Sequence, residues 1–164
     1  MSHEALDPHV GEHLSAADVN YVLRSHSDAG RPIASPADFA KALGIAPDRI
    51  AKTVLLKTRP HGTFVRVTCS TQRPITLHIL AEHLGVSRLS VASVDELRDR
   101  LGQPPMGVSP FAATDVPVIV DTALLDETTV LVGGGTVGVE VELSPRCLVH
   151  ATSATVLAVT AVRA

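Results

Sequence analysis

The spacing of apolar residues predicts helices in four segments of the chain. In residues 15–23, 36–43, 77–84 and 94–101, apolar side chains recur at intervals that place them on one helix face. Each segment carries a helix start or stop signal. The starts are Ser15 with Asp18, Ser35 with Pro36 and Asp38, and Ser93 with Glu96, and the stops are Gly44, Gly85 and Gly102. The stretch 102–110, rich in glycine and proline, predicts a loop.

Other segments have the pattern of β-strands, because they are short apolar runs or alternate between apolar and polar residues. The expected strands are 54–56, 64–69, 116–121, 129–132 and 137–143. A short helix is expected from Ser144 through Val149, with Pro145 in its first turn. The tail 154–162 fits a strand or a helix equally well.

These elements predict a single α/β domain of the α+β kind. Strands and helices do not alternate strictly, so a mixed, partly closed, barrel-like sheet with surrounding helices is favoured over a doubly wound parallel sheet. We expect the domain to span residues 15–164, after an N-terminal arm of residues 1–14. No internal repeat or low-complexity block divides the sequence.

Composition supports a globular protein that is not built to cover duplex DNA. The chain has 164 residues, of which 45% are hydrophobic, 19% charged and only 2% aromatic, so the core must consist of aliphatic side chains. A net charge of -3 argues against a broad basic face for DNA but leaves room for a small positive pocket. The two cysteines, Cys69 and Cys147, are expected as reduced thiols of a cytoplasmic protein. No apolar stretch reaches the ~20 residues of a membrane span, and the N-terminus lacks the pattern of a signal peptide.

Tests for common catalytic motifs are negative. His78 and His83 fall on different faces of their expected helix, and neither cysteine has a nearby cysteine partner, so we expect no metal and no other cofactor. Ser109 lies in Gly107-Val108-Ser109-Pro110. This is not a nucleophile elbow, because proline cannot supply the backbone N–H of an oxyanion hole.

Two further features remain open on residue chemistry alone. Gly133 to Gly135 lead into a strand rather than a helix, so they are either a flexible hairpin loop or a place where a ligand approaches bare backbone. Lys52 precedes an apolar strand and is one of few lysines. It is either a surface residue or a cation placed in a cleft.

Taken in order, several short motifs resemble one family. They are Leu43-Gly44-Ile45, Ile50-Ala51-Lys52-Thr53-Val54-Leu55, Gly102 with Gly107-Val108-Ser109-Pro110-Phe111, Val116-Pro117-Val118-Ile119-Val120-Asp121, Val132-Gly133-Gly134-Gly135 with Gly138, and Val141-Glu142-Leu143. From about Ser35 to Val149 the chain resembles the YbaK/EbsC family of freestanding aminoacyl-tRNA deacylases, which are related to the editing domain of bacterial prolyl-tRNA synthetases. The resemblance implies a mixed barrel-like sheet and hydrolysis of the ester that joins a small wrong amino acid (Cys, Ala or Pro-like) to the 3′ end of tRNA.

The resemblance also implies site residues. Lys52 matches the family's lysine, which holds the terminal adenosine and its phosphate, and a compact cation suits a phosphate. Gly107, Val108 and Ser109 match the loop whose backbone N–H groups hold the ester carbonyl, with Ser109 orienting substrate or backbone rather than attacking. The substrate-binding set implied is Lys52, Met106, Ser109, Pro110, Asp121, Gly133, Gly134 and Gly135, of which Asp121 has a structural alternative. Met106 stands where relatives often have glycine, so it is expected to reshape the amino-acid pocket.

The family's chemistry uses an attacking water helped by the terminal hydroxyl of the tRNA, and this suits a chain without a catalytic triad. The expected partners are the 3′ end of a mischarged tRNA and prolyl-tRNA synthetase, with no DNA and no membrane. The main alternative is a catalytically weak module of the same fold that binds tRNA ends or a synthetase. A third alternative is a hydrolase of another small ester or amide.

Overall fold

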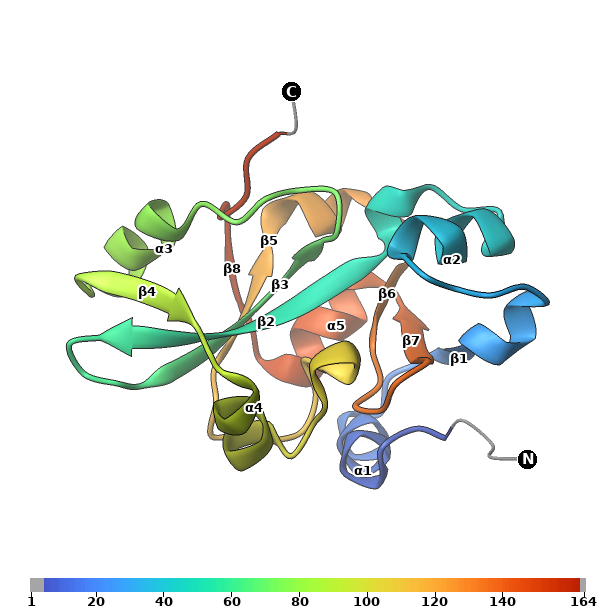
Figure 1. Ribbon diagram of the computed structural model, residues 1–164, viewed down its shortest axis with the longest axis horizontal. Coiled ribbons are helices and arrows are strands. Elements are labelled where there is room, and N and C mark those ends of the chain that lie inside the picture. The colour runs from blue at the N-terminus through green and yellow to red at the C-terminus, as the bar shows by residue number, and fades with distance from the viewer. Residues whose placement is uncertain (1–4, 163–164) are drawn as a thin grey trace.

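A computed structural model describes residues 5–162 of the chain. Within this range the chain forms two β-sheets, five α-helices and several short 3-10 turns (Figure 1). The helices are α1 (Pro8–Ala17), α2 (Pro36–Leu43), α3 (Leu77–Leu84), α4 (Val94–Leu101) and α5 (Pro145–Thr152). The strands are β1 (Val22–Ser25), β2 (Ala51–Arg59), β3 (Phe64–Ser70), β4 (Arg88–Val91), β5 (Val118–Asp121), β6 (Val130–Gly133), β7 (Val139–Leu143) and β8 (Thr155–Leu157).

The larger sheet mixes antiparallel and parallel pairing. Its order is β4-β2-β3-β5-β8, with β2 antiparallel to β3 and β4, and with β5 parallel to β3 and β8. The smaller sheet has the order β1-β7-β6 and is antiparallel. A parallel bridge between Ile50 and Leu131 joins the two sheets just before β2. The predicted mixed, barrel-like α+β fold is therefore confirmed.

The two largest buried clusters lie on opposite faces of the larger sheet, and the first of them also includes the smaller sheet. Aliphatic side chains of β5, β6 and β7 pack together with α1 and α5, for example Val120, Val132, Val141 and Leu148, all fully buried. A second cluster packs α3 against the other face of the larger sheet. The cavity described below opens where the start of β2 passes between the sheets.

The helix expected at residues 15–23 is wrong in position. The observed helix, α1, starts earlier because the Asp7 carboxylate accepts the N–H groups of His9 and Val10. The helix ends at Asp18 in a left-handed conformation. Residues 22 and 23 instead belong to β1, whose pairing with β7 is a long-range contact that local spacing does not reveal. The expected arm of residues 1–14 thus includes most of α1.

The other helices lie where their caps predict them. The Ser35 hydroxyl accepts the N–H of Asp38, and Ser93 and Glu96 form a capping box at the start of α4. Gly44, Gly85 and Gly102 follow the last helical residues with positive φ angles, which glycine adopts without strain. The tail that fitted two patterns contains the strand β8.

Candidate active site

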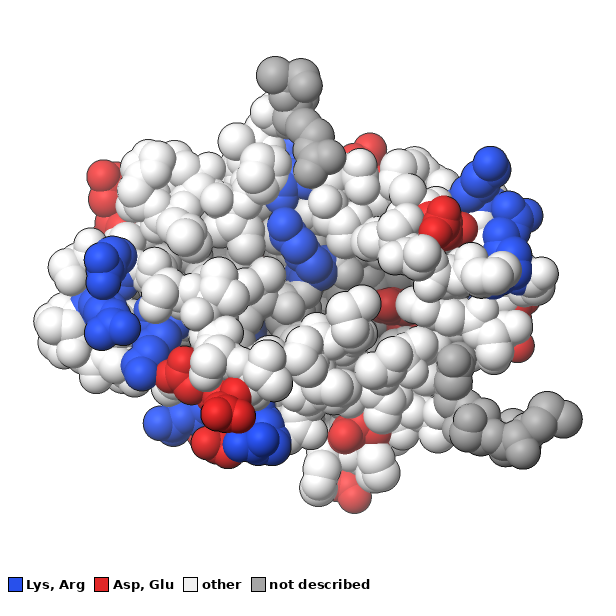
Figure 2. Space-filling model, in the orientation of Figure 1, with Lys and Arg blue, Asp and Glu red and all other residues white. Residues whose placement is uncertain are grey.

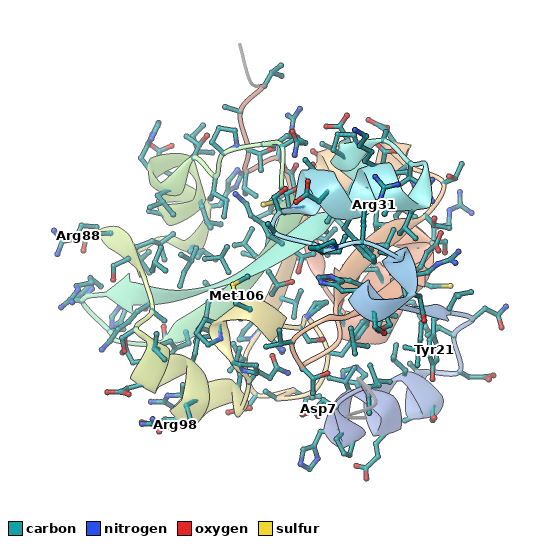
Figure 3. All side chains as sticks on the ribbon, turned by 45° about the vertical axis from the view of Figure 1, so that its right-hand side comes forward. Asp7, Tyr21, Arg31, Arg88, Arg98 and Met106 are labelled. Atoms are coloured by element: carbon teal, nitrogen blue, oxygen red, sulfur yellow. The ribbon has the colours of Figure 1, made fainter. Side chains whose placement is uncertain are left out.

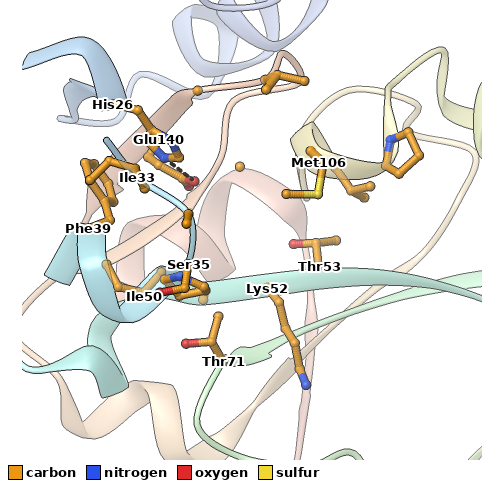
Figure 4. A pocket seen from close by; sticks show the side chains of 18 residues that line it. His26, Ile33, Ser35, Phe39, Ile50, Lys52, Thr53, Thr71, Met106 and Glu140 are labelled. Atoms are coloured by element: carbon orange, nitrogen blue, oxygen red, sulfur yellow. Dashed lines mark ion pairs between the residues drawn. The ribbon is translucent and has the colours of Figure 1, made fainter. Parts of the chain in front are cut away.

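A cavity of about 300 Å³ lies between the two sheets, beside the start of β2. The start of α2 and the segment before it form one side, and the loop after α4 forms another (Figure 4). The remaining wall comes from Gly133 at the end of β6 and from the turn and first residues of β7. Of the candidate site residues named from the sequence, Lys52, Met106, Val108 and Gly133 line this cavity.

Lys52 brings a cation without a partner to the cavity. It is half-buried, and its side chain makes no ion pair or hydrogen bond with any of residues 5–162. It is paired in register with Cys69 on β3. Burial raises the pKa of Cys69 to about 11, although the charge of Lys52 lowers it, so this neighbour is a neutral thiol at pH 7. The positive charge of Lys52 is therefore left for a ligand to neutralise.

The loop after α4 satisfies most of its own backbone. Gly107 donates its N–H to the Pro104 carbonyl at 3.0 Å, and Ser109 donates its N–H to Oε1 of Gln103 at 2.9 Å. The N–H of Val108, which lines the cavity, has no acceptor among the described residues. Within this short motif, Val108 thus carries the backbone donor that remains for a ligand.

Ser109 is fully buried and does not line the cavity. Its hydroxyl accepts the N–H of Phe111 at 3.1 Å, so the side chain holds the loop backbone. Pro110 and Gly107 are buried in the same loop. Asp121 lies outside the cavity, where its carboxylate accepts hydrogen bonds from Val159 N–H and the Thr160 hydroxyl. These contacts tie the end of β5 to the segment after β8.

The three consecutive glycines that begin with the last residue of β6 have different surroundings. A Cβ on Gly133 would lie 2.1 Å from the Val108 carbonyl oxygen, so the close neighbour of its backbone is the loop after α4. A Cβ on Gly135, whose φ is +86°, would lie 2.6 Å from Cβ of Asp7. Gly134 accepts the N–H of Asp7 at 3.2 Å. Gly133 thus lines the cavity, whereas Gly134 and Gly135 pack against the start of α1.

Two ionisable residues that sequence analysis missed also line the cavity, His26 and Glu140. Nε2 of His26 lies 3.6 Å from Oε1 of Glu140, and the His26 ring packs on Phe39 with centroids 4.4 Å apart. His26 Nε2 and Glu140 Oε2 are buried atoms without a hydrogen-bond partner among residues 5–162. The two residues are far apart in sequence and meet only because β1 pairs with β7. The one available signal was a glutamate between two buried valines of β7.

Met106 is an apolar residue on the rim of the cavity. It is 79% exposed although it lines the opening, and in Figure 3 it projects from the loop after α4 over β2.

Figure 2 shows the basic side chains of the same face in separate groups, at its two ends and near its centre. Among the described residues, no group of three or more His, Cys, Asp or Glu is placed to hold a metal ion. None of the described helices is both long and apolar enough to cross a membrane.

Fold and cavity together define a small α+β domain with a cavity of limited size, lined in part by a lysine that has no ion-pair partner among residues 5–162. Residues 30–151 match the family model of the aminoacyl-tRNA editing domain, and the chain belongs to this family. This finding confirms the resemblance to YbaK-type proteins. A solved structure described as "hypothetical protein APE2540" is 28% identical, with 93% of this chain and 99% of the other covered and a TM-score of 0.81. A structure described as "a putative trans-editing enzyme for prolyl tRNA synthetase" is 22% identical, with 96% and 99% covered and a TM-score of 0.80, and shares the fold.

Proposed function

We propose that this aminoacyl-tRNA editing domain is a trans-editing deacylase that hydrolyses the ester between a small mischarged amino acid (Cys, Ala or Pro-like) and the 3′ end of tRNA. The observation that carries the proposal is the unpaired ammonium of Lys52 at a cavity of about 300 Å³. That volume is at the lower end of the range, about 300–1,000 Å³, for small-molecule sites. It suits a small aminoacyl group and excludes larger side chains.

Lys52 binds the phosphate of the terminal adenosine in this proposal. An ammonium is a compact point charge that suits phosphate oxygens. The long aliphatic stem carries the charge away from β2, which fixes its base, and in Figure 4 the ammonium lies on the side of β2 away from His26 and Glu140.

Glu140 and His26 bind the α-ammonium group of the amino acid. Glu140 supplies a carboxylate oxygen without a partner, and the adjacent His26 Nε2 also lacks one, so a bound cation would satisfy the carboxylate. An unsatisfied buried polar group costs about 1–3 kcal/mol, which ligand binding recovers.

Hydrolysis itself is assigned to water. Water oxygen attacks the ester carbonyl carbon, the bond to the ribose oxygen breaks, and the proton ends on that ribose hydroxyl, releasing free amino acid and intact tRNA. The Val108 N–H is a donor for the carbonyl oxygen as it gains negative charge. No protein nucleophile is needed, since Cys69 is a buried neutral thiol and the Ser109 hydroxyl is engaged in the loop.

A panel of mischarged tRNAs tests this function. The full chain is incubated with tRNAs carrying Ala, Cys, Ser or Pro, and the remaining ester is followed over time against a protein-free control. We expect hydrolysis of one or two members, because selection by size admits few side chains. The same panel is run with prolyl-tRNA synthetase added, which reports whether that partner raises the rate. Binding of tRNA without hydrolysis of any member, with or without synthetase, would favour the alternative of a binding module.

A further inference from the structure

Arg66 is a buried arginine in the middle of β3 that directs its guanidinium at one loop. Its exposure is 1%, and in volume it is the first of the fully buried side chains. The carbonyl oxygens of five residues accept its Nη hydrogens at 2.9–3.1 Å, namely Ser109, Phe111, Ala112, Ala113 and Val116. Its Nε–H has no acceptor among residues 5–162. All hydrogen bonds of the guanidinium therefore go to residues 109–116.

The charge of Arg66 is balanced by backbone dipoles rather than by a carboxylate. None of the ion pairs among the described residues includes Arg66. Burial lowers the pKa of Arg66 to about 10, against the raising effect of Asp115, so the guanidinium stays protonated at neutral pH. A protonated arginine fixed by five carbonyls imposes one arrangement on the loop that supplies them.

The loop adopts that arrangement at a conformational cost. Ala112 and Ala113 have φ angles of 62° and 44°, a region that residues with a Cβ seldom occupy. The Ala112 N–H is donated to Nδ1 of His13 on α1, which holds the loop from outside. The hydrogen bonds from Arg66 to the Ala112 and Ala113 carbonyls offset the strain, because they form only when the backbone turns in this way.

The residues just before this stretch form a wall of the cavity, namely Pro105, Met106 and Val108. Ser109, whose carbonyl is bound to Arg66, directly follows Val108, which lines the cavity. The Val108 carbonyl is in close contact with Gly133, where a Cβ would lie only 2.1 Å from it. A displacement of Ser109 would therefore move Val108, whose carbonyl already lies against the backbone of Gly133. Met106 lies two residues before Val108, on the rim.

We propose that Arg66 is a positioning residue of the cavity: it fixes residues 105–109, and through them the Val108 N–H and the Met106 side chain, without touching the substrate. The kinetic consequence rests on the proposed function, whereas the structural consequence does not.

Arg66→Lys is the variant that tests this role, with Val67→Ala as its matched control. Lysine keeps the charge but cannot span five carbonyls in a planar fork. Val67 is the next residue of β3, is fully buried on the opposite face and belongs to the cluster under α3, so its truncation weakens the core without touching the loop. We expect Arg66→Lys to lower kcat per folded molecule at least tenfold with KM for tRNA changed less than threefold. Val67→Ala should keep kcat per folded molecule within twofold.

A second readout needs no activity. The chain has two methionines, Met1 and Met106, so the ¹³C-methyl resonance of Met106 in methyl-labelled protein reports directly on the rim. We expect this resonance to shift or broaden in Arg66→Lys and to stay in place in Val67→Ala. The double variant Arg66→Lys/Ala112→Gly is measured in parallel and is used where the single variant does not fold, because glycine takes the positive φ of residue 112 without strain.

The outcomes separate the two proposals. An unchanged Met106 resonance together with kcat per folded molecule within twofold of wild type would reduce Arg66 to a core residue and overturn its positioning role. If the wild-type chain hydrolyses no mischarged tRNA, the proposed function fails, and the Met106 resonance still decides the role of Arg66.

Discussion

The two sides of the cavity differ in how their polar groups are satisfied. On the side of the loop after α4, Gly107 and Ser109 donate their N–H groups internally and Arg66 binds the carbonyls that follow, so that only the Val108 N–H of this short motif and the Arg66 Nε–H lack an acceptor among residues 5–162. Around the rest of the cavity, Lys52 has no counter-ion among residues 5–162, and His26 and Glu140 each have a buried atom without a partner there. Since unsatisfied buried groups cost free energy, they point to where a ligand supplies the missing partners. The satisfied side sets the shape of the cavity, and the unsatisfied side binds charge.

Removing the charge of Lys52 is the most direct test of whether the groups without partners bind the substrate. Lys52→Ala should lower kcat/KM for aminoacyl-tRNA at least 100-fold, equivalent to about 2.7 kcal/mol, with little change in unfolding temperature because the side chain makes no hydrogen bond or ion pair with residues 5–162. Lys57→Ala is the matched control on the same strand, since Lys57 is ion-paired to Glu96 at 2.9 Å outside the cavity. Single-turnover hydrolysis and thermal melting check both variants. Full activity of Lys52→Ala would remove the lysine from the site.

Adding a side chain at Gly133, next to the loop after α4, should lower the free energy of unfolding by a comparable amount. In Gly133→Ala the new Cβ meets the Val108 carbonyl oxygen, and the backbone must move, at a cost of about 2–3 kcal/mol. Gly11→Ala is the control, because Gly11 lies inside α1 with only a Leu6 methyl at 3.5 Å, and alanine there is expected to stabilise by about 0.5–1 kcal/mol. Urea unfolding measures both. Equal stability of the two variants would mean that the loop around Val108 moves to accommodate the new Cβ without loss of stability.

Neutralising Glu140 tests whether the unsatisfied side recognises the substrate's ammonium. Glu140→Gln keeps size and removes charge, and it should lower kcat/KM about tenfold, equivalent to ~1.4 kcal/mol. An N-acetylated aminoacyl-tRNA lacks the ammonium. With wild-type protein its kcat/KM should be about tenfold lower than that of the free-amine substrate, whereas with Glu140→Gln the two substrates should have the same kcat/KM. This comparison is a double-mutant cycle with one partner on the substrate. Additive losses in the cycle would place the ammonium elsewhere.

Features of the molecule that depend on neighbouring residues could be predicted from the sequence, whereas features that depend on long-range strand pairing could not. Helix caps such as the Ser93–Glu96 box depend on residues close in the chain, and these predictions hold. The His26–Glu140 pair depends on β1 pairing with β7, which local patterns do not encode. Arg66 occupied a polar position in an alternating strand, but β3 is buried on both faces, so the arginine turns inward. For Gly133 the sequence left open a flexible hairpin loop or a place where a ligand approaches bare backbone, and in the structure it is the Val108 carbonyl oxygen that lies close to this glycine.

Glu142 sharpens the comparison because it lies two residues from Glu140 on the same face of β7 yet is fully paired. Its carboxylate accepts hydrogen bonds from Arg24, Arg49 and Thr129. Burial acts to raise the pKa of Glu142, but the hydrogen bonds from Thr129 and Arg24 and the arginine charges outweigh it, and the net pKa is lowered.

A lowered pKa in the folded state means that ionised Glu142 adds stability above its unfolded pKa, about 4.3, and loses it as the pH falls through the folded value. Glu142→Gln should therefore cost about 1 kcal/mol at pH 7 and progressively less below about pH 4.3. Urea unfolding of wild type and variant across pH 3–7 measures the difference. A cost independent of pH would show that the charge of Glu142 is not what the network uses.

The smallest expected effect concerns Met106, the apolar residue on the rim between the two sides. Because it is 79% exposed, Met106→Gly should change stability by less than about 1 kcal/mol. Loss of the side chain widens the opening, so the variant should hydrolyse larger aminoacyl groups that wild type rejects, with a severalfold gain for these and little change for the preferred one. The mischarged tRNA panel, extended to Val and Leu, measures the ratio of kcat/KM values, which is the quantity that defines specificity. An unchanged profile would mean that Met106 points away from the bound amino acid and that the cavity interior alone sets the size limit.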